Sequence, residues 1–266
     1  MARALLVALV LLTCGTLYLF IARIWWMPAL ISVSGAAVDR EFDATLLILA
    51  IVFVLAQIGL GLFVWRYRRS KAAAYSTGHR GAEFIWTAIT AAIFIAMAVT
   101  GQRTWAELRA SHVSPQDEVQ VEVTGTQFAW YFRYPGPDDK FGATIPANVD
   151  ASLGSASAIG LDANDPAAKD DIVTAALVVP TNREVRLKLH AQDVIHSFFV
   201  PELRLKQDAV PGLNVEAYFK ATIPGDYEIV CAELCGLGHY RMHGKMRVVS
   251  EEDFSNWLRQ QEGAAR

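Results

Sequence analysis

The side chains best suited to metal chemistry in this 266-residue chain gather in one short window near its C-terminus. The window runs from residue 231 to residue 242 and contains Cys231, Glu233, Cys235, His239 and Met242. A second imidazole, His196, lies upstream. Thiolate, imidazole and thioether groups are the ligands that copper prefers. A single blue-copper ion usually takes one cysteine, so this set better suits two copper ions bridged by both sulfurs.

Three other interpretations of the window remain open from the residues alone. Cys231 and Cys235 could form a disulfide in an oxidising compartment, although three cysteines in the whole chain are too few for a disulfide framework. Zinc also takes cysteine and histidine, but it would leave Met242 unused. A mononuclear blue-copper site would leave one cysteine unexplained. The complete set favours the copper pair.

The spacing Cys-x-Glu-x-Cys-x3-His-x2-Met resembles the binuclear copper (CuA) motif of subunit II of the haem-copper cytochrome c oxidases of bacterial type. His196 and the segment 206–212 fit the same family, and the resemblance covers about residues 28–250. It implies that the six residues bind CuA, with Glu233 contributing its backbone carbonyl. It also implies that the Glu233 side chain reaches a Mg ion shared with subunit I.

The resemblance implies a function and partners as well. The copper pair would accept electrons from cytochrome c or another periplasmic donor and pass them to haem in subunit I. There oxygen is reduced to water, coupled to proton pumping. Related possibilities are a CuA subunit of a nitric oxide reductase and a stand-alone copper-binding or copper-delivery protein. No Cys-x-x-Cys-His occurs in the sequence, so no c-type haem is fused to this chain.

Two long apolar runs precede the soluble part of the chain. Residues 46–65 and 84–99 carry no charge, and about twenty residues of helix cross a membrane. They predict a transmembrane hairpin over 31–104, with helices at about 44–66 and 82–102. The connecting segment carries Arg66, Arg68, Arg69, Lys71 and Arg80. The positive-inside rule therefore places it in the cytoplasm and the copper domain in the periplasm of a bacterial inner membrane.

The N-terminal segment 1–30 is also apolar. Its sequence fits either a cleaved signal peptide or an additional transmembrane helix, and the region 32–37 is a candidate cleavage site. Both interpretations place the residues that follow it outside the cytoplasm. The net charge of −3 gives the chain no broad basic surface, which excludes nucleic acid as a partner.

Residues 105–266 predict an all-β domain. Hydrophobic residues alternate with polar ones in 119–123 and 185–189, and strand-like runs follow at 214–220, 226–231 and 245–249. Several short strands separated by turns favour a Greek-key barrel of the cupredoxin-like kind. A short helix is expected at 251–261. Residues 136–175 interrupt the pattern as a mobile insertion with a net charge of −5, a possible landing surface for a basic electron donor.

Other residues carry roles only through the resemblance. Glu83, at the start of the second membrane helix, would mark a proton inlet; an acid at a helix N-terminus is the simpler interpretation. Family members of the mitochondrial type have a tryptophan over the copper site as electron inlet, where this chain has Phe128. Trp130 lies two positions on, expected on the same strand face. Asp193 matches an acidic docking position. His79, His112, His190 and His243 are expected to be ordinary.

Overall fold

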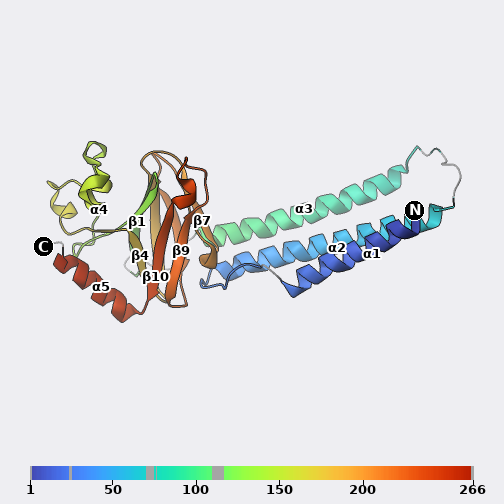
Figure 1. Ribbon diagram of the computed structural model, residues 1–266, viewed down its shortest axis with the longest axis horizontal. Coiled ribbons are helices and arrows are strands. Elements are labelled where there is room, and N and C mark those ends of the chain that lie inside the picture. The colour runs from blue at the N-terminus through green and yellow to red at the C-terminus, as the bar shows by residue number, and fades with distance from the viewer. Residues whose placement is uncertain (1, 24–25, 70–74, 76, 110–116, 265–266) are drawn as a thin grey trace. The chain divides into compact units, whose positions relative to one another are not determined.

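The computed structural model describes residues 2–23, 26–69, 75, 77–109 and 117–264 (Figure 1). His112 and much of the loop after Arg69 lie outside these residues. The chain divides into two compact units. One comprises Met1–Met27 and Ala37–Thr104, and the other comprises Pro28–Ala36 and Trp105–Arg266.

The first unit is built from long apolar helices. They are α1 (Ala2–Ala22), α2 (Gly35–Tyr67) and α3 (Arg80–Leu108), and each is long and apolar enough to cross a membrane. Both hairpin helices extend beyond the predicted 44–66 and 82–102. The Thr100 hydroxyl of α3 donates a hydrogen bond to the Glu41 carboxylate of α2 at 2.7 Å. The N-terminal segment thus forms a third helix of membrane-spanning length.

The second unit contains two five-stranded sheets and is cupredoxin-like, as the sequence predicts. In spatial order the first sheet contains β3 (Ile172–Thr174), β2 (Ala129–Tyr134), β1 (Val119–Thr126), β5 (Glu184–Ala191) and β8 (Val215–Lys220). The second contains β4 (Ala176–Pro180), β10 (His243–Val249), β9 (Gly225–Cys231), β6 (His196–Val200) and β7 (Leu205–Ala209). Neighbouring strands are often distant in sequence, and β1–β5 and β4–β10 pair in parallel.

Strand periodicity explains how the core forms. Successive side chains of a strand point to opposite faces. In β5, Val185, Leu187 and Leu189 are fully buried, while the residues between them are partly exposed. The C-terminal helix α5 (Glu251–Ala264) begins with a capping serine, since the Ser250 hydroxyl accepts a hydrogen bond from the Asp253 amide at 3.1 Å. Trp257 of α5 packs edge-on against a buried tyrosine of β2, with ring centroids 5.0 Å apart.

The segment between α1 and α2 folds with the β domain, and we call Pro28–Ala36 the strap. Ile31 is 2% exposed and belongs to the hydrophobic core. Its amide donates to the Glu202 carbonyl at 3.0 Å, and its carbonyl accepts from the Thr222 amide at 2.7 Å. Ser32 forms an isolated bridge with Ala221, just after β8. The strap thus belongs to the β domain, which it joins through one isolated β-bridge and a core residue, whereas the sequence predicts that residues 31–36 belong to the membrane hairpin.

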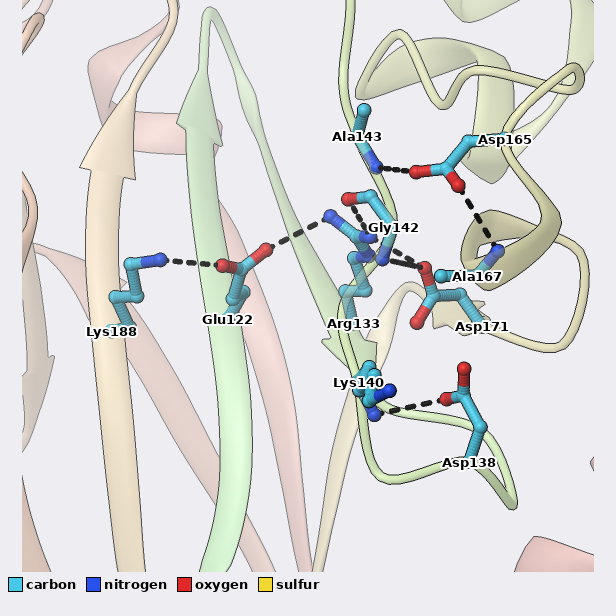
Figure 2. A network of polar contacts seen from close by, with 10 residues as sticks. All are labelled: Glu122, Arg133, Asp138, Lys140, Gly142, Ala143, Asp165, Ala167, Asp171 and Lys188. Carbon is cyan, nitrogen blue, oxygen red and sulfur yellow. Dashed lines mark hydrogen bonds and ion pairs between the residues drawn. The ribbon is translucent and has the colours of Figure 1, made fainter.

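The acidic segment 136–175 contains local structure that its sequence does not reveal. It includes three turns of 3-10 helix, the short helix α4 (Ser155–Ala158) and β3. Figure 2 shows how Arg133 of β2 connects it to the sheet. The buried guanidinium pairs with Glu122 of β1 at 3.0 Å and with Asp171 at 2.5 Å, and it donates to the Gly142 carbonyl. Lys188 completes the network by pairing with Glu122 at 2.9 Å.

Candidate metal centre

Three neighbouring strands of the second sheet bring the candidate ligands together. His196 is the first residue of β6 and Cys231 is the last residue of β9. These strands pair side by side, and β10 pairs with β9 on the other side. The loop after β9 carries Cys235, and a single 3-10 turn, η5 (His239–Arg241), leads to Met242 just before β10. All of these ligands therefore lie on one end of the sheet.

The donor atoms lie close to one another around the two sulfurs. The Cys231 and Cys235 sulfurs are 3.8 Å apart. The Nδ1 atom of His196 lies 3.9 Å from the Cys231 sulfur, and Nδ1 of His239 lies 3.6 Å from the Cys235 sulfur. The Met242 sulfur is 3.8 Å from that of Cys235. The structure therefore brings together all five side chains expected to act as ligands.

The backbone supplies a sixth donor. The Glu233 carbonyl oxygen lies 3.2 Å from the Cys231 sulfur, while the Glu233 side chain is exposed. The carbonyl of this residue therefore lies beside the Cys231 sulfur, and its carboxylate lies at the protein surface.

Both cysteines are free, so the disulfide interpretation does not describe this structure. The donor set also fits a soft metal. Zinc–sulfur bonds are about 2.3 Å long, so an ion of similar size lying between two sulfurs 3.8 Å apart can contact both. Among the described residues, His196, Cys231 and Cys235 form the one group whose ligand atoms converge as a metal site requires.

Burial shapes the chemistry of this site. His196 is 0% exposed, and both cysteines and Met242 are buried, whereas His239 is half-buried. Burial and the neighbouring Cys231 thiol raise the pKa of Cys235 to about 11. The metal-free site therefore keeps a proton on Cys235 at neutral pH. A bound metal must displace that proton, because the thiolate is the form that coordinates.

Phe128 and Trp130 both adjoin the site, but in different ways. Phe128 is 38% exposed and precedes β2, in a turn with a cis peptide bond after Gln127. Its ring lies against Gly236 and Gly238 of the ligand loop. Trp130 is 2% exposed and meets the His196 ring edge-on, with centroids 5.9 Å apart. The expectation that both lie on one strand face is wrong, because β2 begins only at Ala129.

The remaining candidates lie elsewhere. Glu83 is in the first turn of α3, which begins at Arg80, and its amide donates to the His79 carbonyl at 3.0 Å. The His79 ring accepts from the Ala82 amide at 3.1 Å and so caps this helix. His243 pairs with Glu228 at 2.7 Å.

His190 is partly buried beside Thr124, at 3.0 Å from its hydroxyl, and burial lowers the pKa of this histidine. It is no candidate ligand, because no described cysteine, histidine or carboxylate joins it in a metal-binding group.

Two residues beside the site carry contacts that sequence reasoning did not assign. The Asp193 carboxylate lies 2.8 Å from Nε2 of His196, and the Gln127 side-chain amide donates to the Cys235 carbonyl at 2.5 Å. The position of Asp193, three residues before a candidate ligand, is a signal that could have suggested the first contact. The second joins residues far apart in the sequence and leaves no local signal.

Comparisons with known proteins identify a family for this chain. Residues 119–250 match the family model for the periplasmic domain of cytochrome c oxidase subunit II, and residues 27–102 match the model for its transmembrane domain. The alternative cytochrome c oxidase subunit 2 of Bradyrhizobium diazoefficiens is 31% identical, over 98% of this chain and 92% of that protein. Cytochrome c oxidase subunit 2 of Cereibacter sphaeroides is also 31% identical, over 82% and 74% of the two chains.

A solved structure is similar as well. The crystal structure of the periplasmic domain of subunit II of cytochrome oxidase from Bradyrhizobium japonicum shares 29% identity. It covers 58% of this chain and 100% of that chain, with a TM-score of 0.42. The two family models together span both the helical part and the β domain. The chain belongs to the cytochrome c oxidase subunit II family, a copper-binding family of membrane-anchored oxidase subunits with a periplasmic domain.

Proposed function

We propose that this chain holds a binuclear CuA centre and serves as the electron-accepting subunit of its oxidase. One observation supports the proposal: the four other donors around the two cysteine sulfurs divide evenly into two pairs. Besides the two shared thiolates there are two imidazoles and two weak donors, the Met242 thioether and the Glu233 carbonyl. That is one imidazole and one weak donor for each of two ions. A single ion would leave part of this set unused.

When bound, the copper pair would take up one electron at a time and release it again. The donor is cytochrome c or another periplasmic carrier, and the acceptor is haem in subunit I, where oxygen is reduced and protons are pumped. The family membership supports this role. The chain would lie in the bacterial inner membrane as a multi-pass protein, with its β domain in the periplasm. The cationic segment between α2 and α3 supports this orientation.

Electrons would reach the centre through Phe128, with Trp130 behind it. Phe128 is an exposed aromatic ring that touches the ligand loop. Trp130 lies under the surface, against a ligand imidazole. Phenylalanine is harder to oxidise than tryptophan. Phe128 would therefore provide a packing surface for the donor protein and would not itself be oxidised or reduced.

Two further roles belong to the complete oxidase. The Glu233 carbonyl faces the Cys231 sulfur, while its side chain is exposed. The carboxylate is therefore available to bind a Mg ion together with groups of subunit I. Glu83 at the N-terminus of α3 would take part in proton uptake. Both roles need partner groups, so the isolated chain should bind no Mg tightly.

Electron paramagnetic resonance of the full chain in detergent, loaded with copper, tests the central proposal. An electron shared by two copper nuclei gives a seven-line hyperfine pattern, and Cys231→Ser or Cys235→Ser should each abolish it. Met242→Leu should retain copper while shifting the reduction potential. A four-line pattern in the unmodified chain would refute the binuclear centre. Co-purification with a haem-bearing subunit that consumes oxygen would test the assignment to an oxidase separately.

A further inference from the structure

Among the residues that the structure describes, Asp193 makes four polar contacts, all within the β domain. Its Oδ1 atom lies 2.8 Å from Nε2 of His196 and accepts from the Val194 amide at 2.7 Å. Its Oδ2 atom accepts from the Gln127 amide at 2.6 Å and from the Thr126 hydroxyl at 3.3 Å. The side chain is 29% exposed. Both carboxylate oxygens are therefore engaged within the protein, although the charge lies near its surface.

These contacts decide which ring nitrogen of His196 is free for a metal. The two nitrogens of a neutral imidazole are distinct, and the hydrogen bond made by one leaves the other as the ligand. Nε2 is held by Asp193, so Nδ1 faces the Cys231 sulfur at 3.9 Å. The ring is fixed on its sides as well, because Trp130 and the backbone at Gly125 lie against it.

The Asp193 carboxylate is also linked, through Gln127, to the loop that carries Cys235. Gln127 donates its backbone amide to Asp193 and its side-chain amide to the Cys235 carbonyl, at 2.5 Å. The next residue, Phe128, packs on the loop that follows Cys235. A continuous path of hydrogen bonds therefore runs from His196 through Asp193 and Gln127 to Cys235.

We infer that Asp193 is a positioning residue of the metal centre, and that with Gln127 it braces the His196 segment against the Cys235 loop. This inference rests on the proposed CuA centre. It departs from the docking role that the family resemblance suggests for Asp193. A docking charge must be free to meet a cation on the partner, whereas both oxygens of Asp193 are already engaged by internal donors.

The contact between the Asp193 carboxylate and His196 also affects the electronic properties of a bound metal. A carboxylate that accepts the outer N–H of a ligating histidine makes that ligand more basic and raises metal affinity, typically by 10- to 100-fold. A more basic ligand stabilises the oxidised metal more than the reduced one. Removing the charge should therefore raise the reduction potential, even where the ring keeps its position.

The test compares Asp193→Asn and Asp193→Ala with Asp226→Asn in the full copper-loaded chain. Asp226 is a matched control: it lies on β9 like Cys231 but near the opposite end of the strand, and its carboxylate pairs with Arg247 at 3.0 Å. Both asparagine variants remove one negative charge. Reduction potential, copper hyperfine pattern and copper affinity are measured, together with the association rate of a cationic donor protein at low and high salt.

We expect Asp193→Asn to raise the potential while keeping the seven-line pattern, and Asp193→Ala to weaken copper binding by about 10- to 100-fold. Asp226→Asn should leave all three copper properties unchanged. Unaltered copper properties in both Asp193 variants would overturn the inference. If these variants changed only the association of the donor protein, making it slower and less salt-dependent, Asp193 would be a docking residue instead. The copper hyperfine pattern of the unmodified chain tests the CuA centre independently. Failure of the proposed CuA centre can therefore be told apart from failure of the role inferred for Asp193.

Discussion

Replacing Ile31 with alanine tests whether the strap is part of the β domain's core. The side chain is 2% exposed and packs in the same cluster as the sheet residues. Truncating a buried isoleucine to alanine typically costs about 2–5 kcal/mol, from lost burial and the cavity left behind. Val33, two residues on, is 57% exposed. Val33→Ala should change the unfolding free energy by about 0.5 kcal/mol or less, as surface substitutions do.

Thermal unfolding of the full chain in detergent, followed by near-ultraviolet circular dichroism, measures this difference. For a domain of this size, 1 kcal/mol shifts Tm by about 2–4 °C. Ile31→Ala should therefore lower the Tm of the β domain by about 4–20 °C, and Val33→Ala by about 2 °C or less. Equal shifts in the two variants would refute the assignment of the strap to the core. A soluble fragment that begins after α3 should show the same loss, because it lacks Ile31.

Three further predictions concern the β domain. Tyr134→Phe should lower the unfolding free energy by about 1–3 kcal/mol in urea titrations, since the hydroxyl serves both the carbonyl and the amide of buried Val178. Arg133→Met should cost about 3–5 kcal/mol, because it leaves the buried Asp171 carboxylate without an ion pair, and adding Asp171→Asn should restore part of the loss. Burial lowers the pKa of His190, so only the unfolded chain takes up this proton near pH 6.5; stability should fall below that pH, and His190→Gln should reduce the fall.

The sequence predicts those parts of the fold that a local pattern encodes. Alternation at 185–189 identifies β5, and the uncharged runs identify α2 and α3. The strand β6 has no such signal. Its side chains are buried at four of five positions, so it shows no alternation, and its role is set by neighbours far away in the chain.

The sequence also gives no local signal that the strap belongs to the β domain, for a related reason. Pro28–Ala36 lies between two apolar helices, and sequence position alone therefore assigns it to the membrane part. Its partners lie about 170 to 190 residues away, at Leu203 and Thr222. No local propensity reveals a segment whose hydrogen bonds to the β domain are made at that separation.

The residues of the candidate metal centre can be predicted from the sequence, but their surroundings cannot. Ligand identity follows from residue type and spacing, since few metals use thiolates, imidazoles and a thioether together. The outer contacts depend on how the turn at 126–128 meets the Cys235 loop. For that reason the sequence predicts Phe128 on a strand, whereas the chain turns at this residue.

The strap also constrains how the chain can thread through a membrane. Pro28–Ala36 ends in the first turn of α2 and the remainder of its domain begins at Trp105 near the end of α3, yet the two pieces share one core. They must therefore end on the same side of the membrane, which requires an even number of crossings between them. The pair α2 and α3 meets this parity. A hairpin inserted with only one of these helices would separate Ile31 from its core, so completion of the β domain acts as a check on correct insertion.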